Sequence, residues 1–433
     1  MRRIIVFPAL LMLFLITACT QDQESNWNQY LGPHRNATIN GTDILDSWEN
    51  GYPKELWSFP LGEGYGGASI FGTEVFILDR IKGQSDVLRC IDFVSGEEKW
   101  NFTYEAEGEL PFPGSRGVPT VDKNYIWSVG PHGDFYCFDK ETQKPIWHHD
   151  LLEEFDRILS TWGVSQSPIV YKDLVIVAPH GNKAGVAAFD KISGQEVWRS
   201  RPLSGPNYHV SPTLANYGGV DQVIMISPYD REDSTRLHEV VAFDAITGKE
   251  LWKYNGLRSF STITPATVID DTRLFLTDNS FDGAYDPVSI MIEIKKTGGE
   301  FAVKELFLTE EAGSKMHPPV LFENHLYLNH TGNPNQMMCL TLDGEMVWKK
   351  NEAPGFELGA LILVNNLILN QNGKNGDIHL IQPSTGGYKE LGKASYFSSK
   401  KSQAWAPLAF SQGKLIIRDL EKMVCLDLQV LEE

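Results

Sequence analysis

Positive charge is scarce in this chain of 433 residues. Lys and Arg total 38 against 56 Asp and Glu, which gives a formal net charge of −18 at pH 7. A protein that binds a nucleic-acid backbone neutralises phosphates with Lys and Arg. We therefore predict no nucleic-acid partner. The acidic balance favours solubility and a polar or cationic partner.

Cysteine is also sparse, and no two of the five cysteines are adjacent. Neither a nucleophile–base pair nor a spacing typical of metal ligands can be identified. The nearest approach to a calcium loop is an acidic turn with Asp278, Asp282 and Asp286, which does not match a known spacing. We therefore predict no catalytic residue and no bound metal.

A hydrophobic run long enough to span a bilayer is missing at the N-terminus. Residues 4–16 are apolar but too short for a mature transmembrane helix. They follow two arginines and precede a small-residue site ending at Cys19, an order typical of a secretory signal. The site resembles a bacterial lipobox. We predict a signal peptide over 1–18, a lipidated Cys19 and an N-terminal extension with a tether over 19–53. An ordinary signal peptide with a chance cysteine is the alternative.

The chain does contain a repeated pattern. Each copy has an apolar run, an Asp, a turn closed by Gly, a second short run and a Trp. This order is typical of a β-hairpin, and its recurrence indicates a repeat architecture. We expect the Asp to bond the turn and the Trp to pack between neighbouring units. The copies carry Asp92 and Trp100, Asp139 and Trp147, Asp190 and Trp198, Asp244 and Trp252, and a shortened copy ends at Trp348.

The spacing of the copies predicts eight units. The tryptophans recur roughly every 50 residues, and worn copies near residues 292–306, 380–391 and 424–428 complete the series. A second pattern agrees with this count, because a small residue or Pro precedes eight β-rich runs. These residues are Ser69, Pro119, Pro168, Pro212, Pro265, Pro319, Ala360 and Pro407. We predict an all-β, eight-bladed β-propeller of four-stranded repeats over residues 54–433.

The last unit lacks a strand, and the N-terminal part has one to spare. The chain ends shortly after the third strand of the eighth unit. Residues 54–59, which include Trp57, look like a fourth strand with no blade before it. We predict that this N-terminal strand closes the ring and removes two exposed sheet edges.

Four cysteines occupy one position of the repeat. Cys90, Cys137 and Cys425 each stand two residues before the repeat Asp, and Cys339 stands two before Thr341. In other copies the same position is alanine. We predict a buried slot for small residues on the third strand, with four free thiols. Export normally favours disulfides, so this prediction is a demanding one.

The repeats resemble a known family. Residues 241–252 match the PQQ-like propeller repeat almost throughout, and the resemblance recurs in phase over 54–433. Together with the lipobox, the eight blades resemble the BamB type of outer-membrane-protein assembly lipoprotein. Residues 27–35 are similar to an N-terminal motif of secreted PQQ-repeat proteins of unsettled function. Quinone-dependent dehydrogenases of this fold also carry adjacent cysteines, a calcium site and an Asp base. Adjacent cysteines are absent here, so no cofactor is expected, and PQQ with calcium is the alternative.

One face of the propeller gathers polar residues. Loops that lead into a first strand share a face with turns between second and third strands. On this candidate ligand or partner face the first kind of loop carries Arg116, Tyr208, His209, His317, Glu357 and Trp405, and the turns carry His132, His180 and His330. Two interpretations remain open. The side chains bond loop carbonyls around a wet channel, or they bind a ligand in a central funnel.

Three functions follow from these patterns. The leading one is a non-enzymatic, lipid-anchored interaction scaffold of the cell envelope, with outer-membrane protein assembly as a candidate role. We expect it to bind protein partners through loops 104–117 and 150–164. The alternative is a quinoprotein-like dehydrogenase or small-ligand binder that uses the His and Arg residues. The third is a carbohydrate-binding surface protein that uses Trp162 and Trp405.

Overall fold

The computed structural model describes residues 26–48, 53–203, 209–228, 237–259, 263–279, 285–348, 353–398 and 403–430. Cys19, Tyr208 and Asp282 lie outside these ranges. In the described part, no helix is long and apolar enough to cross a membrane.

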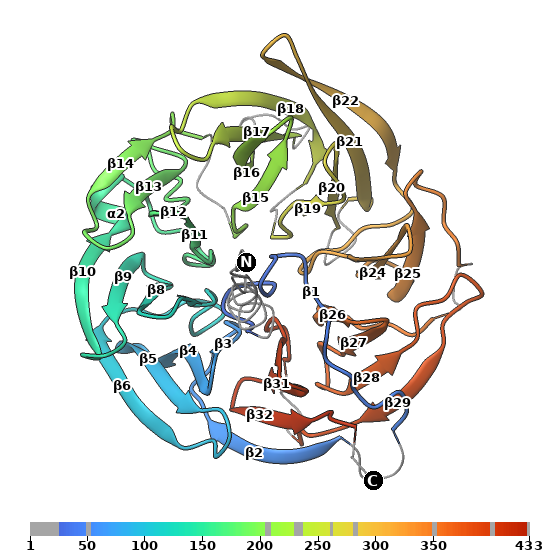
Figure 1. Ribbon diagram of the computed structural model, residues 1–433, viewed down its shortest axis with the longest axis horizontal. Coiled ribbons are helices and arrows are strands. Elements are labelled where there is room, and N and C mark those ends of the chain that lie inside the picture. The colour runs from blue at the N-terminus through green and yellow to red at the C-terminus, as the bar shows by residue number, and fades with distance from the viewer. Residues whose placement is uncertain are drawn as a thin grey trace, which may run out of the picture.

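Eight small antiparallel sheets surround a central axis, and each runs from an inner strand to an outer one (Figure 1). The first two blades consist of β3 (Ser69–Phe71), β4 (Glu74–Ile81), β5 (Ser85–Asp92) and β6 (Glu98–Glu105), then β7 (Thr120–Val121), β8 (Tyr125–Val129), β9 (Asp134–Asp139) and β10 (Lys144–Asp150). Blades three and four consist of β11 (Ile169–Tyr171), β12 (Leu174–Val177), β13 (Ala187–Asp190) and β14 (Glu196–Arg199), then β15 (Thr213–Tyr217), β16 (Val220–Pro228), β17 (Leu237–Asp244) and β18 (Glu250–Arg258).

The second half of the ring repeats this order. Blades five and six consist of β19 (Thr267–Val268), β20 (Arg273–Asp278), β21 (Val288–Thr297) and β22 (Glu300–Thr309), then β23 (Val320–Phe322), β24 (His325–His330) and β25 (Gln336–Thr341). Blades seven and eight consist of β26 (Leu361–Val364), β27 (Leu367–Gln371), β28 (Ile378–Ile381) and β29 (Glu390–Ala394), then β30 (Ala409–Ser411), β31 (Lys414–Arg418), β32 (Lys422–Asp427) and β2 (Lys54–Pro60). The predicted all-β, eight-bladed propeller is confirmed.

The ring closes as the sequence predicts. The N-terminal strand β2 pairs antiparallel with β32, and Trp57 lies opposite Cys425. The last blade is therefore built from both ends of the propeller, with β2 as its outermost strand.

Blades six and seven depart from the four-stranded pattern. Among the described residues, blade six has three strands, and the stretch before Trp348 contributes one bridge, between Leu340 and Met346. Its turn is shorter than in the other copies, because Gly344 N already donates to Thr341 O at 3.1 Å. Blade seven gains a strand, since β1 (Thr38–Ile39) runs parallel to β26.

The repeat residues tie each blade to its neighbour. Asp190 Oδ1 accepts the backbone N–H groups of Ile192 and Ser193 at 3.2 and 2.7 Å. These bonds lower the pKa of the Asp190 carboxyl. Gly194 ends this turn with φ of +73°, and the ring of Trp147 from the preceding blade packs on it: a Cβ there would lie 2.7 Å from Cγ of Trp147. The turn thus forms the seat for the tryptophan.

The cysteine slot lies opposite these tryptophans. Cys90 pairs with Trp100, Cys137 with Trp147 and Cys425 with Trp57 across the third and fourth strands. All four cysteines of the described chain are free and buried. Burial raises the pKa of the Cys90 thiol to about 12 and that of Cys339 to about 11. Each thiol therefore serves as a small apolar group.

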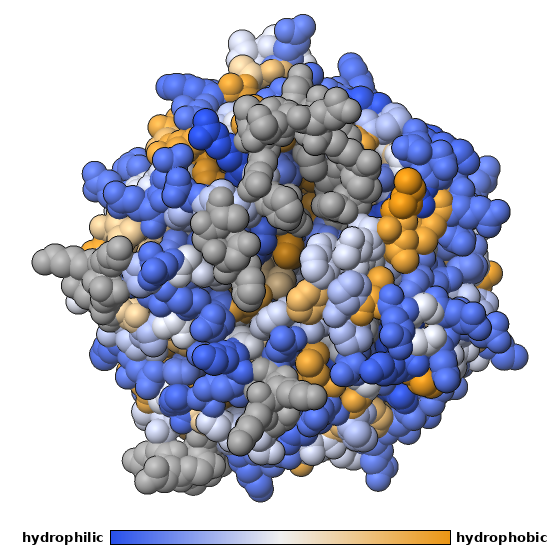
Figure 2. Space-filling view, turned by 180° about the vertical axis from the view of Figure 1, so that it is seen from behind, coloured by the Kyte–Doolittle hydropathy of each residue, from blue (hydrophilic) through white to orange (hydrophobic). Residues whose placement is uncertain are grey.

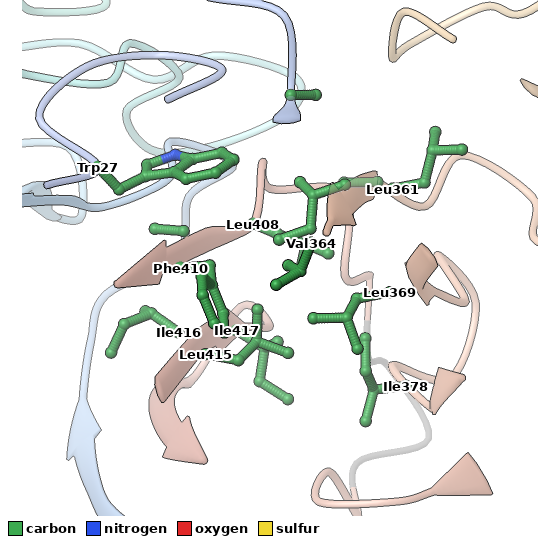
Figure 3. Close-up of a cluster of buried hydrophobic side chains, with 14 of the residues drawn as sticks. Trp27, Leu361, Val364, Leu369, Ile378, Leu408, Phe410, Leu415, Ile416 and Ile417 are labelled. Atoms are coloured by element: carbon green, nitrogen blue, oxygen red, sulfur yellow. The ribbon is translucent and has the colours of Figure 1, made fainter. Parts of the chain in front are cut away.

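The largest buried cluster spans the junction between the last blades and the N-terminal extension. Trp27, which is 1% exposed, lies over Phe410 of β30 and faces Val364 of β26 (Figure 3). Burial of an aromatic ring of this size contributes strongly to stability. The extension therefore belongs to the core of the propeller.

Candidate functional site

The candidate site lies on the face of the ring where each blade connects to the next. This face, here called the loop face, also carries the turns between second and third strands. Figure 2 views the molecule from this side and shows apolar side chains near the centre among hydrophilic ones. The opposite face, which carries the turns between first and second strands, is called the plug face below.

Four aromatic side chains meet on the loop face, although they come from four separate loops. Trp405 stacks on Tyr65 with ring centroids 5.2 Å apart and an interplanar angle of 23°. Phe112 lies 5.0 Å from Trp162 and 5.8 Å from Trp405. Phe112, Trp162 and Trp405 remain partly exposed. These residues (Tyr65, Phe112, Trp162, Trp405) are called the aromatic cluster.

Arg116 lies beside this cluster and is held by backbone oxygens. Its guanidinium carbon lies 5.9 Å from the centroid of the Tyr65 ring, and its side chain donates to Gly114 O at 3.0 Å and to Phe112 O. Burial lowers the pKa of Arg116 to about 10, so it remains a cation at neutral pH. Arg116 thus fixes the loop that carries Phe112 and adds a positive charge to an aromatic surface.

Three of the predicted histidines, His180, His209 and His317, are buried on the loop face. His209 Nδ1 lies 3.2 Å from Ser165 Oγ, and His317 Nε2 lies 2.9 Å from the carbonyl of Trp405. Burial lowers the pKa of His209 to about 3, with a further contribution from Arg116, and that of His317 to about 4. Burial also lowers the pKa of His180 well below its usual value. These rings are therefore neutral at pH 7.

The other predicted residues of the described chain lie on the same face. His132 is half-buried, and burial lowers its pKa. His330 is buried, and its Nδ1 lies 3.1 Å from Gly313 N. Glu357 accepts from Asn335 Nδ2 at 3.3 Å. Arg116 and Trp405 therefore meet at the aromatic cluster, and His317 contacts the backbone carbonyl of Trp405. His132, His330 and Glu357 lie on other loops of the same face.

Asp278, the first carboxylate of the acidic turn considered above as a calcium loop, forms a buried ion pair with Lys315. Asp278 is fully buried, and its Oδ1 lies 3.2 Å from Nζ of Lys315. Tyr285 donates to Asp278 Oδ2 at 3.2 Å, and Ser259 also donates to it. Burial raises the pKa of the Asp278 carboxyl, and Lys315 opposes this shift. Among the described residues, no three His, Cys, Asp or Glu side chains gather as a metal site.

Sequence reasoning missed Tyr65 and Phe112. The sequence does contain a feature that could have pointed to Tyr65, because this residue lies in the glycine-rich run 62–67. A Cβ on Gly66 would lie 2.7 Å from Gly117 O, and one on Gly67 would lie 2.6 Å from Pro407 O. Glycine thus lets the loops from three blades approach closely enough to assemble the cluster.

The comparisons with known proteins agree with this architecture. A family model described as outer membrane protein assembly factor BamB matches residues 83–350, more than half of the chain. The chain belongs to this family. The resemblance to PQQ-like propellers related to BamB is thereby confirmed. Comparison with curated proteins gives no match.

Solved structures of several kinds share the fold. BamB from Moraxella catarrhalis is 13% identical, with a TM-score of 0.60, and covers 88% of this chain and 99% of its own. A europium-containing methanol dehydrogenase is also 13% identical, with a TM-score of 0.63 and coverage of 92% and 90%. The designed protein Ika8 is 12% identical, with a TM-score of 0.57 and coverage of 86% and 99%. At these identities the likeness shows the fold alone.

The residues present do not fit a quinone cofactor with calcium. The four described cysteines lie on third strands of different blades, so no adjacent pair is available among them to lie against a cofactor ring. The buried carboxylate Asp278 already faces the ammonium group of Lys315, where a divalent cation would need further oxygen ligands.

Proposed function

We propose that this protein is a non-enzymatic, lipid-anchored scaffold of the cell envelope, and that it binds a protein partner on its loop face, in outer-membrane protein assembly. The aromatic cluster is the observation that carries the proposal. Tyr and Trp are enriched at the centres of protein interfaces, because they offer a large rigid apolar surface with a polar handle. Membership of the BamB family supports the envelope and the assembly role.

A loop beside the aromatic cluster adds an exposed apolar residue to the proposed binding surface. Loop 150–164 carries Trp162 and Ile158, and the Ile158 side chain is 72% exposed. The helix α2 (Leu151–Glu154) and its N-cap Asp150 hold the start of this loop, since Asp150 Oδ1 accepts from Leu152 N at 2.9 Å. An exposed apolar residue on an anchored loop is a surface that a partner can bury at little entropic cost.

Co-purification from native membranes tests this proposal. The double variant Phe112→Ala, Trp162→Ala should keep the melting temperature within a few degrees but lose at least about tenfold of a stoichiometric partner, as hot-spot truncation does. The control Val197→Ala removes an exposed apolar residue at the outer edge of the ring and should keep the partner. Equal recovery with both variants would contradict the proposal.

A small-ligand binder that uses the His and Arg residues of this face is the second candidate, because Arg116 is a cation beside stacked aromatic rings. Thermal-shift measurement with PQQ and calcium distinguishes it. The scaffold proposal expects no shift. A shift that is lost in His209→Ala would favour the ligand-binding alternative.

A further inference from the structure

The N-terminal extension is built into the plug face of the propeller. Asn26 Oδ1 accepts from Gly72 N at 2.6 Å, in the turn between β3 and β4. Trp27 O accepts from Ile70 N at 2.8 Å, and Asn28 exchanges two bonds with Val121 at the end of β7. The chain thus first meets the ring on the plug face, at blades one and two.

The next residues cross the channel to the other side of the ring. Arg35 Nη1 and Nη2 lie 3.4 and 3.3 Å from the carbonyl oxygens of Pro168 and Pro212, which precede the inner strands of blades three and four. Desolvation lowers the pKa of Arg35 to about 10, and its guanidinium lies 5.9 Å from the centroid of the Tyr30 ring. β1 then pairs with β26 of blade seven. One short segment therefore bonds to the inner parts of five blades.

The motif at residues 27–35 explains how this segment holds its shape. Gly32 has φ of +79°, and a Cβ there would lie 2.9 Å from the Trp27 ring. Trp27, Tyr30 and Leu31 are buried, and Gln29 Nε2 donates to Pro33 O at 3.0 Å. The segment is thus a packed unit whose glycine seats its own tryptophan. Figure 1 shows it at the centre of the ring.

The length of chain before this segment limits where an anchor can lie. Six residues separate Cys19 from Asn26, and the seven steps between the two Cα atoms span at most about 25 Å. To reach the loop face around the rim of the ring, residues 20–25 would first have to cross the strands of a blade, which lie about 4.8 Å apart. They would then have to run the length of an outer strand such as β6, which has 8 residues at about 3.3 Å per residue. That path exceeds their reach, and the packed segment occupies the direct path through the channel.

We infer that residues 26–39 are a built-in plug of the channel, and that they hold the anchored propeller with its plug face toward the lipid surface and its loop face away from it. The inference rests on the proposed lipidation of Cys19. It assigns a role to the N-terminal motif, and it leaves the aromatic cluster accessible from the side opposite the membrane.

Fluorescence quenching by lipids tests the orientation. The full lipoprotein is placed on vesicles that contain a nitroxide-headgroup phospholipid, with a fluorophore on Asn40→Cys (exposed, plug face) or on Ile158→Cys (exposed, loop face). We expect several-fold stronger quenching at position 40. Equal quenching at both positions, or stronger quenching at position 158, would overturn the inference.

Two further arms separate the ways in which the inference can fail. Mass spectrometry of the N-terminal peptide reports acylation: an unmodified Cys19 overturns both the proposed anchoring and the inference, whereas an acylated Cys19 without the quenching contrast overturns the inference alone. Trp27→Ala should keep acylation but lose the contrast between positions 40 and 158. The control Val197→Ala should keep both acylation and the contrast. A contrast that persists in Trp27→Ala would show that the plug does not set the orientation.

Discussion

At the scale of single residues, burial sets the chemistry of the titratable groups around the channel. His209 and His317 are 5% exposed, and their pKa values fall to about 3 and 4 because a buried imidazolium loses its hydration. A histidine that cannot be protonated near pH 7 is a poor proton shuttle, but it is a good hydrogen-bond donor to a loop carbonyl. These histidines therefore act on the loop face as neutral hydrogen-bonding groups and not as proton carriers.

The buried histidines predict an acid sensitivity. Their folded pKa values lie below the unfolded value of about 6.5, so the unfolded state binds more protons below that pH. Stability should be complete above about pH 6.5 and fall as the pH drops toward 4. His209→Gln should reduce the slope of unfolding free energy against pH by up to about 1.4 kcal/mol per unit. Urea unfolding at pH 4.5–7.5 measures it.

The control for this prediction is Val197→Ala, which changes an exposed side chain that does not titrate. It should leave the slope between pH 4.5 and 6.5 unchanged. Identical slopes for His209→Gln and the wild type would contradict the assignment of the acid sensitivity to the buried ring.

The buried cysteines should resist alkylation in the folded protein. Burial raises the pKa of Cys90 and Cys425 to about 12, so almost no thiolate forms at pH 8. Iodoacetamide should leave Cys90, Cys137, Cys339 and Cys425 unmodified in the folded protein and alkylate all four in urea, as read by peptide mass spectrometry. Rapid alkylation of the folded protein, or a Cys90–Cys137 bridge under non-reducing conditions, would refute the buried slot.

At the scale of elements, the contact between a tryptophan and the next blade's turn determines how blades join. Gly96 seats Trp57, Gly194 seats Trp147 and Gly248 seats Trp198, and a Cβ added to any of these glycines would lie 2.5–2.7 Å from the nearest ring atom. Trp57 Nε1 also donates to Phe93 O of the next blade at 3.0 Å. The same seat closes the ring between the last blade and the first.

Gly194→Ala tests this contact. The added methyl group meets Trp147 and also sits at φ of +73°, so we expect a loss of roughly 2–4 kcal/mol, from overpacking together with the backbone strain. Gly219→Ala is the control, because Gly219 has φ of +75° with nothing within 4 Å of its Cβ, and it should cost about 1 kcal/mol. Chemical denaturation reports both. Equal losses of unfolding free energy in the two variants would show that the contact between Gly194 and Trp147 contributes nothing to stability.

The repeat made the blades predictable from sequence, because each copy carries its own turn and packing residues. The closing strand followed from the same pattern, since Trp57 has no blade before it. The plug was not predictable, because Trp27 and Arg35 bond to residues that are remote in sequence. Two members of the aromatic cluster, Trp162 and Trp405, were named from the sequence as binding candidates. Tyr65 and Phe112 join them only through loop conformations that no periodicity encodes.

At the scale of the whole molecule, the two faces of the ring differ. The plug face carries the N-terminal segment, which is bonded to several blades. The loop face carries the aromatic cluster, neutral histidines and the exposed Ile158. A rigid ring with one occupied face and one aromatic face is suited to hold a partner on the second.

Site-specific photo-crosslinking in intact cells tests partner binding on the loop face most directly. A photoreactive amino acid replaces Ile158 on the loop face or Ile246 on the opposite side, which are both exposed isoleucines. We expect a discrete adduct with one envelope protein from position 158 and no such adduct from position 246. Uncrosslinked monomer alone from position 158, or the same adduct from both positions, would contradict a partner bound on the loop face.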